Sequence, residues 1–400
     1  MESDRLQITK RDLARFIIMR QHLSGNSGKK KADDSSRILK VLDNIRYLQL
    51  DPVRAVEKSH FLTLWSRIGH YRQEALADLI YTRHLLTESY AHMAAISLAE
   101  DIHLLSIGML ERRERLFMKH PDISVHFDKV KNFLEINGPM YSSQFPEFDV
   151  GSALSGWGHE RKINLLLDLM HWTGDIVICN RSVSGQKLWA LPRVMLENTT
   201  SSGQSDRNEA EKEVFMKSLY SLGIASSDQI LRYYTPFRIA HPGKVVEELI
   251  NEQKVIPVEI TGMKGVRKKS WYVLKKDIDA IEKIENVWKP RSVLLSPFDN
   301  LIIDRKRTME IFDFDGRLEM YINKSKRKYG FYAMPFLHGD RIVGRIDPKF
   351  DRKTGILKVN AIHDEGKYFS TSRTRRALLD SIDSLGNFVQ ATKIELPNLV

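Results

Sequence analysis

Cysteine is nearly absent from this chain of 400 residues. The single Cys179 excludes an internal disulfide and fits a reducing cytoplasm, which is the location that we expect. The sequence also lacks a Cys/His cluster with zinc spacing and a glycine-rich phosphate loop, so we expect neither a metal nor a cofactor. No apolar run reaches the length of a membrane span or follows the first residues as in a signal peptide, so we expect no membrane partner.

Positive charge is present in excess. The 62 Lys and Arg residues outnumber 51 Asp and Glu residues, which gives a net charge of +11, while the apolar content of 42% is ordinary. A basic surface of this size indicates a polyanionic partner, although many soluble proteins are basic for no specific reason. The length of the chain indicates roughly two to four packed units.

Two stretches, residues 127–192 and 208–277, share one order of elements: helix, turn, helix and an apolar hairpin with a polar tip. A weaker third instance lies in residues 7–97, with a hairpin around residues 83–87. This order predicts winged helices, in which one helix enters a groove of DNA and the wing tip contacts phosphates. Ordinary solvated turns and protein contacts are the alternatives. The first tip carries Arg181, and the second carries the predicted DNA-binding residues Lys264, Arg267, Lys268 and Lys269.

The C-terminal part is predicted to be rich in strands. Strands are expected at residues 318–322 and 330–334, and a final helix at 367–390. The link between the two strands is strongly basic, and a basic hairpin suits a phosphate backbone. Its predicted DNA-binding residues are Lys324, Lys326, Arg327, Lys328 and Tyr329, of which the tyrosine could stack or wedge.

A polar pair, Gln49 and Asp51, follows a predicted helix that Ser36 caps and that continues through residues 45–48. Pro52 moves Asp51 out of the helical region, and in an extended segment residues two apart point to the same side. The amide could orient a water molecule while the carboxylate accepts its proton or stabilises a nearby cation. An Asp before Pro is, however, most often a cap or turn residue.

Several blocks of sequence together carry a resemblance to a known family. They are residues 48–52, 59–60, 64–67, 88–92, 294–299, 304–305, 328–332, 338–341 and 343–349. In this order the chain resembles the bacterial winged-helix crosslink-repair DNA glycosylases of YcaQ/AlkZ type, and the segment Gln49–Asp51 is similar to the Gln-apolar-Asp branch of that family.

The resemblance implies an α+β fold with tandem winged-helix domains and a C-terminal β-rich part, which form a concave DNA-binding surface. The domains expected are residues 1–120 with the Gln-Leu-Asp motif, a second winged helix at 121–205, a third at 206–280 and the β-rich region at 281–400. The partner implied is double-stranded DNA with alkylated or crosslinked purines, bound by a monomer in a bacterial cytoplasm.

The implied activity is that of a monofunctional DNA glycosylase in base-excision-type repair. It hydrolyses the N-glycosidic bond of N7-alkylated purines, including those in interstrand crosslinks. Such a base is cationic and leaves readily, so one carboxylate can suffice. We expect Asp51 and Gln49 to be catalytic, with His92 either supporting the site or packed as a structural residue. The alternative is a non-catalytic winged-helix DNA-binding protein or transcriptional regulator.

Overall fold

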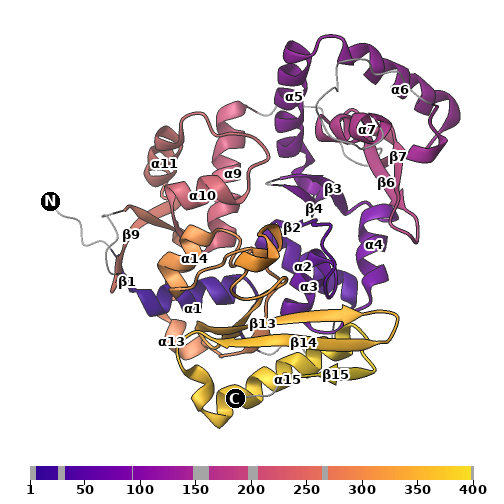
Figure 1. Cartoon of the computed structure of the whole chain (residues 1–400). Coiled ribbons are helices and arrows are strands. Elements are labelled where there is room, and N and C mark those ends of the chain that lie inside the picture. The colour runs from indigo at the N-terminus through magenta and orange to yellow at the C-terminus, as the bar shows by residue number, and fades with distance from the viewer. Residues whose placement is uncertain are drawn as a thin grey trace. The chain divides into compact units, whose positions relative to one another are not determined.

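The structure is a computed structural model that describes residues 6–25, 32–91, 93–146, 162–196, 206–263 and 269–397. The chain forms two compact units. Unit 1 comprises Met1–Leu76, Glu211–Tyr234 and Ala240–Val400, and unit 2 comprises Ala77–Ala210 and Thr235–Ile239. The chain passes from one unit to the other within helices α4 (Gln73–Tyr81) and α9 (Arg207–Leu222), and again after Tyr234 and after Ile239 (Figure 1). The four domains expected from the sequence remain a prediction.

The N-terminal segment of unit 1 starts as a strand. The amphipathic pattern of residues 7–22 predicts a helix that Thr9 or a neighbour could cap. The helix is α1 (Lys10–Arg20), and Thr9 caps it by accepting a hydrogen bond from the backbone of Asp12. Strand β1 (Leu6–Thr9) precedes it and pairs in parallel with β9 (Val255–Thr261). The sequence did not indicate this strand, because the four residues form their ladder with a segment far along the chain.

A winged-helix arrangement in unit 1 agrees with the pattern of residues 208–277. Its elements are α9, β8 (Ile224–Ser226), α10 (Ser227–Tyr233), α11 (Pro242–Asn251), β9 and β10 (Trp271–Leu274). The strand order is β1-β9-β10-β8. The buried side chains of β9, β10 and α1 form one core with those of the C-terminal region, among them Leu13, Val258, Val273 and Leu337.

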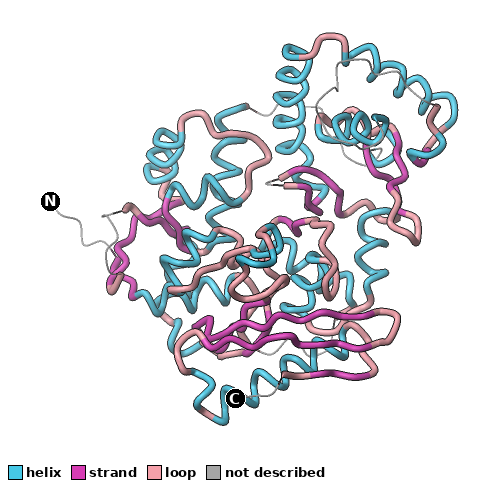
Figure 2. The backbone as a smooth tube through the Cα atoms, in the orientation of Figure 1, coloured by secondary structure: helices cyan, strands magenta, loops and turns pink. Residues whose placement is uncertain are grey.

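The C-terminal sheet of unit 1 has the order β11-β12-β13-β14-β15. Its strands are β11 (Ser292–Leu294), β12 (Met334–His338), β13 (Arg341–Asp351), β14 (Ile356–Asp364) and β15 (Lys393–Glu395). Figure 2 shows the long strands β13 and β14 side by side, and their register shifts between Asp347 and Pro348. The final helix, α15 (Ser372–Phe388), packs against β11, β12 and β15. The sequence also predicts a helix from Asp304 through Phe312. This helix is α14 (Arg305–Phe312), and Asp304 is its N-cap.

The two strands predicted at residues 318–322 and 330–334 are wrong. The first stretch is a 3-10 helix, η5 (Glu319–Tyr321), and a second 3-10 helix, η6 (Lys324–Lys326), follows it. The next strand, β12, begins only at Met334. The backbone groups that a hairpin would pair instead bind the side chains of Glu319 and Arg327.

Unit 2 contains the other predicted helix-and-hairpin stretch. Helices α5 (Ile102–Lys119), α6 (Ile123–Asn137) and α7 (Lys162–Trp172) accompany a sheet of order β5-β7-β6, formed by β5 (Met140–Tyr141), β6 (Val177–Arg181) and β7 (Lys187–Ala190). Phe127, Leu134, Leu166, Met170 and Trp189 lie in its core. The β6–β7 hairpin confirms the prediction from sequence, and Gly174 with φ of +80° follows α7 as expected.

The hairpin predicted around residues 83–87 begins later. It consists of β3 (Leu86–Tyr90) and β4 (Ala94–Leu98). Arg83 and Leu85 donate backbone hydrogen bonds to Asp78 and Leu79, so this stretch ends helix α4 and does not turn a hairpin. Among the described residues, no helix combines the length and the apolar character that crossing a membrane requires.

Candidate active site

The segment that carries Gln49 is a strand, not the end of a helix. Helix α2 (Asp34–Ile45) ends at Arg46, which has φ of 63°, and β2 (Tyr47–Gln49) follows. The prediction of helix through residues 45–48 is therefore wrong, because the left-handed residue turns the chain into an extended path. The N-cap of α2 is also Asp33 and not Ser36, since the Asp33 carboxylate accepts the Ser36 backbone N–H at 2.9 Å.

The backbone of β2 is held by side chains from distant parts of unit 1. Asn300 Nδ2 donates to the Tyr47 carbonyl at 3.1 Å, and Ser59 Oγ donates to the Gln49 carbonyl at 2.7 Å. The Tyr233 hydroxyl donates to the Ile45 carbonyl, 2.8 Å away. These bonds fix the backbone on which Gln49 stands, which is a requirement for a site that positions a reactant.

Gln49 is buried, with 9% of its surface exposed. Its Oε1 accepts no hydrogen bond from the protein groups that the structure describes. A buried amide oxygen is costly without a donor, so this atom favours the approach of one. The predicted role of Gln49, to orient a water molecule, matches this property.

Asp51 follows β2 and is half-buried. Its Oδ1 accepts the Val53 backbone N–H at 2.8 Å, which is the local turn expected for an Asp before Pro52. Its Oδ2 accepts the hydroxyl of Tyr321 at 2.9 Å. A carboxylate has about four lone-pair positions, so two donors leave it able to accept a further proton or to face a cation. The turn role and the catalytic role are therefore compatible in one side chain.

The loop after Asp51 is tied to the C-terminal sheet. Glu57 is buried and receives two hydrogen bonds from Arg54, at 2.6 and 2.7 Å. The Ala55 carbonyl accepts the backbone N–H of Phe350 in β13 at 3.0 Å. Burial, and then the charges of Asp51 and Glu57, raise the pKa of Tyr332, so that tyrosine stays protonated beside them.

Residues 319–330 form a closed turn, which we call the basic turn. The Glu319 carboxylate accepts backbone N–H groups of Lys328, Tyr329 and Gly330 at 2.9, 2.5 and 3.1 Å. Burial raises the pKa of Glu319, but these three donors outweigh it and the net pKa is lowered. The carboxylate thus remains charged and keeps the turn closed.

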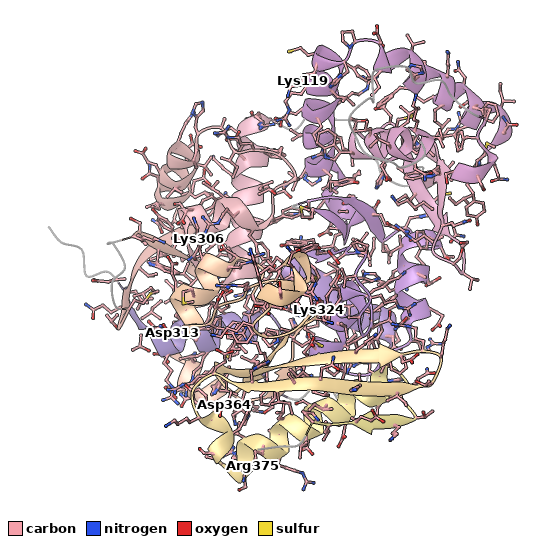
Figure 3. All side chains as sticks on the ribbon, in the orientation of Figure 1. Lys119, Lys306, Asp313, Lys324, Asp364 and Arg375 are labelled. Carbon is pink, nitrogen blue, oxygen red and sulfur yellow. The ribbon has the colours of Figure 1, made fainter. Side chains whose placement is uncertain are left out.

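The exposed lysines of the basic turn are Lys324, Lys326 and Lys328. Lys324 is labelled in Figure 3, where it lies above the long strands of the C-terminal sheet in this view. The two other predicted contacts are engaged within the protein. Arg327 Nε donates to the Glu319 and Ile322 carbonyls, at 3.0 and 2.8 Å. The ring of Tyr329 lies 3.7 Å below the guanidinium of Arg345 and makes an edge contact with His363.

Two of the remaining basic residues, Lys269 and Arg181, form ion pairs with acidic side chains of the protein. Lys264, Arg267, Lys268 and His92 lie outside the described residues. Lys269 forms an ion pair with Glu310 of α14. In unit 2, Arg181 at the end of β6 binds the buried Glu88 through two hydrogen bonds of 2.7 and 2.6 Å. The surroundings of Arg181 therefore do not favour a contact between its guanidinium and a phosphate of DNA.

The sequence missed Tyr321 and Asn300 as members of the site. No local pattern indicated Tyr321, because its hydrogen bond to Asp51 joins residues 270 positions apart. Asn300 follows the block 294–299, and no local pattern indicates that its side chain reaches the Tyr47 carbonyl. Next to it, Asp299 forms a fully buried ion pair with Arg67, with N···O distances of 2.6 and 2.9 Å. Arg67 also binds Gln21 at 2.9 Å.

The fold defines a class: winged-helix proteins with a C-terminal sheet and a carboxylate site beside a basic turn. Residues 42–388 match the model of a family described as DNA glycosylase AlkZ-like. The chain belongs to this AlkZ-like family of DNA glycosylases, which makes it an enzyme of DNA repair with DNA as its substrate. The α+β fold and the expected family are thus confirmed.

A solved structure supports the fold over the whole length. The chain is similar to the DNA glycosylase AlkZ of Streptomyces sahachiroi, with a TM-score of 0.63 and 13% sequence identity. The match covers 98% of this chain and 100% of that one. At this identity the likeness concerns the fold and not the substrate.

Proposed function

We propose that this DNA glycosylase hydrolyses the N-glycosidic bond of N7-alkylated purines, including purines held in interstrand crosslinks. The observation that carries the proposal is the pair Gln49 and Asp51, on a firmly held strand end beside the basic turn. Asp51 activates the attacking water and stabilises the cationic sugar, and Gln49 orients that water. The leaving base already carries a positive charge, so it needs no acid to protonate it.

The glycosylase is proposed to be monofunctional. Among the described residues, the side chain that donates to Asp51 is the hydroxyl of Tyr321. Gln49, two residues before Asp51, carries an amide. Neither can form a Schiff base with the sugar, which requires an amine. The expected product is therefore an abasic site in an intact strand.

The surroundings of Asp51 support a bulky substrate. Asp51 is half-buried, and its partner Tyr321 keeps 66% of its surface exposed. A base in a crosslink stays attached to the opposite strand and cannot enter a tight, closed pocket in the manner of usual base flipping. An accessible carboxylate at the protein surface suits such a base. We further propose that the protein acts as a monomer in a bacterial cytoplasm.

The test of the proposal is base release from duplex DNA that carries one N7-methylguanine. Protein in excess should release the base faster than the enzyme-free background, and alkali should be needed to cleave the strand afterwards. A duplex with a crosslink between two N7-alkylated purines should then be unhooked. Binding without release would instead support the alternative, a non-catalytic winged-helix DNA-binding protein.

Neutralising the exposed lysines of the basic turn should weaken DNA binding. Changing Lys324, Lys326 and Lys328 to Gln should reduce affinity for all sequences and flatten the salt dependence by roughly one unit per lost phosphate contact. Titrations at several salt concentrations measure both effects. The matched control removes three exposed lysines from the β14–β15 region, Lys353, Lys358 and Lys393. Equal salt slopes in the two triple variants would contradict a contact between the basic turn and DNA.

Removing the amide of Gln49 should slow base release without abolishing it. Gln49→Met keeps a similar volume at this buried position but cannot orient water, so we expect a loss of about 10-fold. Single-turnover rates measure the loss, and melting curves show whether packing is preserved. A wild-type rate in a well-folded Gln49→Met variant would contradict the assigned role.

A further inference from the structure

Tyr321 is an aromatic residue that the fold leaves largely in solvent. It lies in η5 with 66% of its surface exposed, and its hydroxyl donates to Oδ2 of Asp51 at 2.9 Å. One end of the ring is thus fixed at the proposed catalytic carboxylate while much of the side chain remains open. Tyrosine is enriched at binding interfaces because its ring is apolar while its hydroxyl keeps a hydrogen-bond partner.

The backbone on both sides of Tyr321 is fixed. Arg327 Nε donates to the carbonyls of Glu319 and Ile322, at 3.0 and 2.8 Å. The Glu319 side chain is itself buried against the backbone of residues 328–330. Tyr321 is therefore presented from a rigid turn, and its position does not depend on the ring packing into a core. Phe331, 40% exposed, directly follows this turn, and its ring centroid lies 5.0 Å from the Arg327 guanidinium.

We propose that Tyr321 is a second functional residue of this site, which orients the Asp51 carboxylate through its hydroxyl and receives the cationic base on its ring. The proposal rests on the function proposed above for Asp51 and names what that site recognises: the positive charge of the alkylated base. Tyr321 touches the carboxylate in the free protein and would touch the substrate in the complex.

The two roles follow from the chemistry of the side chain. Burial, and then the hydrogen bond to Asp51, raise the pKa of Tyr321 above its ordinary value, so the hydroxyl is a donor throughout the neutral range. The donor selects one orientation of the carboxylate and leaves the remaining lone pairs for water. The ring face is electron-rich and attracts a cation, and a neutral purine gains only the ordinary stacking energy. Tyr321 thereby favours a positively charged base over an unmodified one.

Two substitutions separate the roles. Tyr321→Phe removes the hydroxyl and keeps the ring, so base release from N7-methylguanine DNA should slow about 10-fold while affinity stays close to wild type. Tyr321→Leu also removes the ring, so the preference for N7-methylguanine DNA over undamaged DNA should fall about 5-fold in addition. Tyr321→Trp should restore the preference and not the rate. Tyr368→Phe, in the 3-10 helix Tyr368–Ser370, serves as the control for loss of a tyrosine hydroxyl.

The measurements are single-turnover base release, equilibrium binding to both duplexes and a melting curve for each variant. Tyr321→Phe with a wild-type rate overturns the orienting role, and Tyr321→Leu with a wild-type preference overturns the role of the ring. If Tyr321→Leu melts lower, Tyr321→Phe, which is nearly isosteric, and Tyr321→Trp, whose larger ring the exposed position accommodates, still decide both points. Wild-type protein that releases no base above the enzyme-free background would overturn the proposed function itself, and an Asp51→Asn variant that releases base normally would overturn the catalytic role of Asp51, whatever the Tyr321 variants do.

Discussion

Asp51→Asn should lower the single-turnover rate of base release by about 10²–10⁴-fold, which is roughly 3–5 kcal/mol of barrier. Asparagine is nearly isosteric. Its single oxygen can keep the hydrogen bond from the Val53 backbone, and its amide nitrogen, at the place of Oδ2, can donate to the Tyr321 hydroxyl instead of accepting from it. It cannot accept a proton from water or offset a developing cation with a full negative charge. The folded structure and the affinity for DNA should therefore stay close to wild type while the chemistry is lost.

The control for this variant is Asp383→Asn, which removes an exposed carboxylate from α15. It should bind and release base as the wild type does. N7-alkylguanine is lost spontaneously, so each rate must be compared with the rate without enzyme. Base release by Asp51→Asn at the wild-type rate, together with an unchanged melting temperature, would show that Asp51 is not catalytic. Its role would then be that of a turn residue, which accepts the backbone hydrogen bond of Val53.

The sequence predicts the parts of this fold that local patterns determine. The apolar hairpin of β6 and β7, the cap at Thr9 and the helix over residues 304–312 all depend on residues close together in the chain. Capping and alternation of apolar residues act over a few positions, so one sequence suffices to locate them. The resemblance to the glycosylase family likewise agreed with the family to which the chain belongs.

The basic turn shows why the rest was not predictable. Alternating apolar and polar residues at 318–322 favour a strand, yet Glu319 binds three backbone N–H groups of residues 328–330 and forms a closed turn. The sequence gives no indication that the carboxylate of a residue in a predicted strand will accept hydrogen bonds from several backbone N–H groups. The same holds for Arg46, whose left-handed conformation ends α2 without a glycine.

Charge alone also misled the assignment of contacts. Arg181 lies at the tip of a predicted wing and resembles a phosphate ligand in the sequence. In the structure it is bound to the buried carboxylate of Glu88. Burial raises the pKa of Glu88, and the hydrogen bonds and charge of Arg181 outweigh this and lower it. Sequence cannot distinguish a basic residue that is free from one that neutralises a buried acid elsewhere in the fold.

The buried pair Arg67 and Asp299 should be the most sensitive point for stability in unit 1. Both side chains have no exposed surface, and their two hydrogen bonds measure 2.6 and 2.9 Å. Arg67→Met leaves the Asp299 carboxylate buried without its counter-charge, which should cost about 3–5 kcal/mol of unfolding free energy. Asp299→Leu likewise leaves the Arg67 guanidinium buried without its counter-charge. Because the loss falls on the turn whose Asn300 holds the Tyr47 carbonyl, base release should also decline.

Denaturant unfolding followed by a probe confined to unit 1 measures the loss, because two compact units need not unfold as one. The exposed pair of α15, Arg376 and Asp380, is the matched control, with side chains 81% and 62% exposed. Arg376→Met should cost less than about 1 kcal/mol, since solvent already screens that pair. The double variant Arg67→Met/Asp299→Leu should be more stable than either single variant, because no unpaired charge remains buried. If the single losses instead add in the double variant, the two charges do not depend on one another, and the stability of this region rests on its packing.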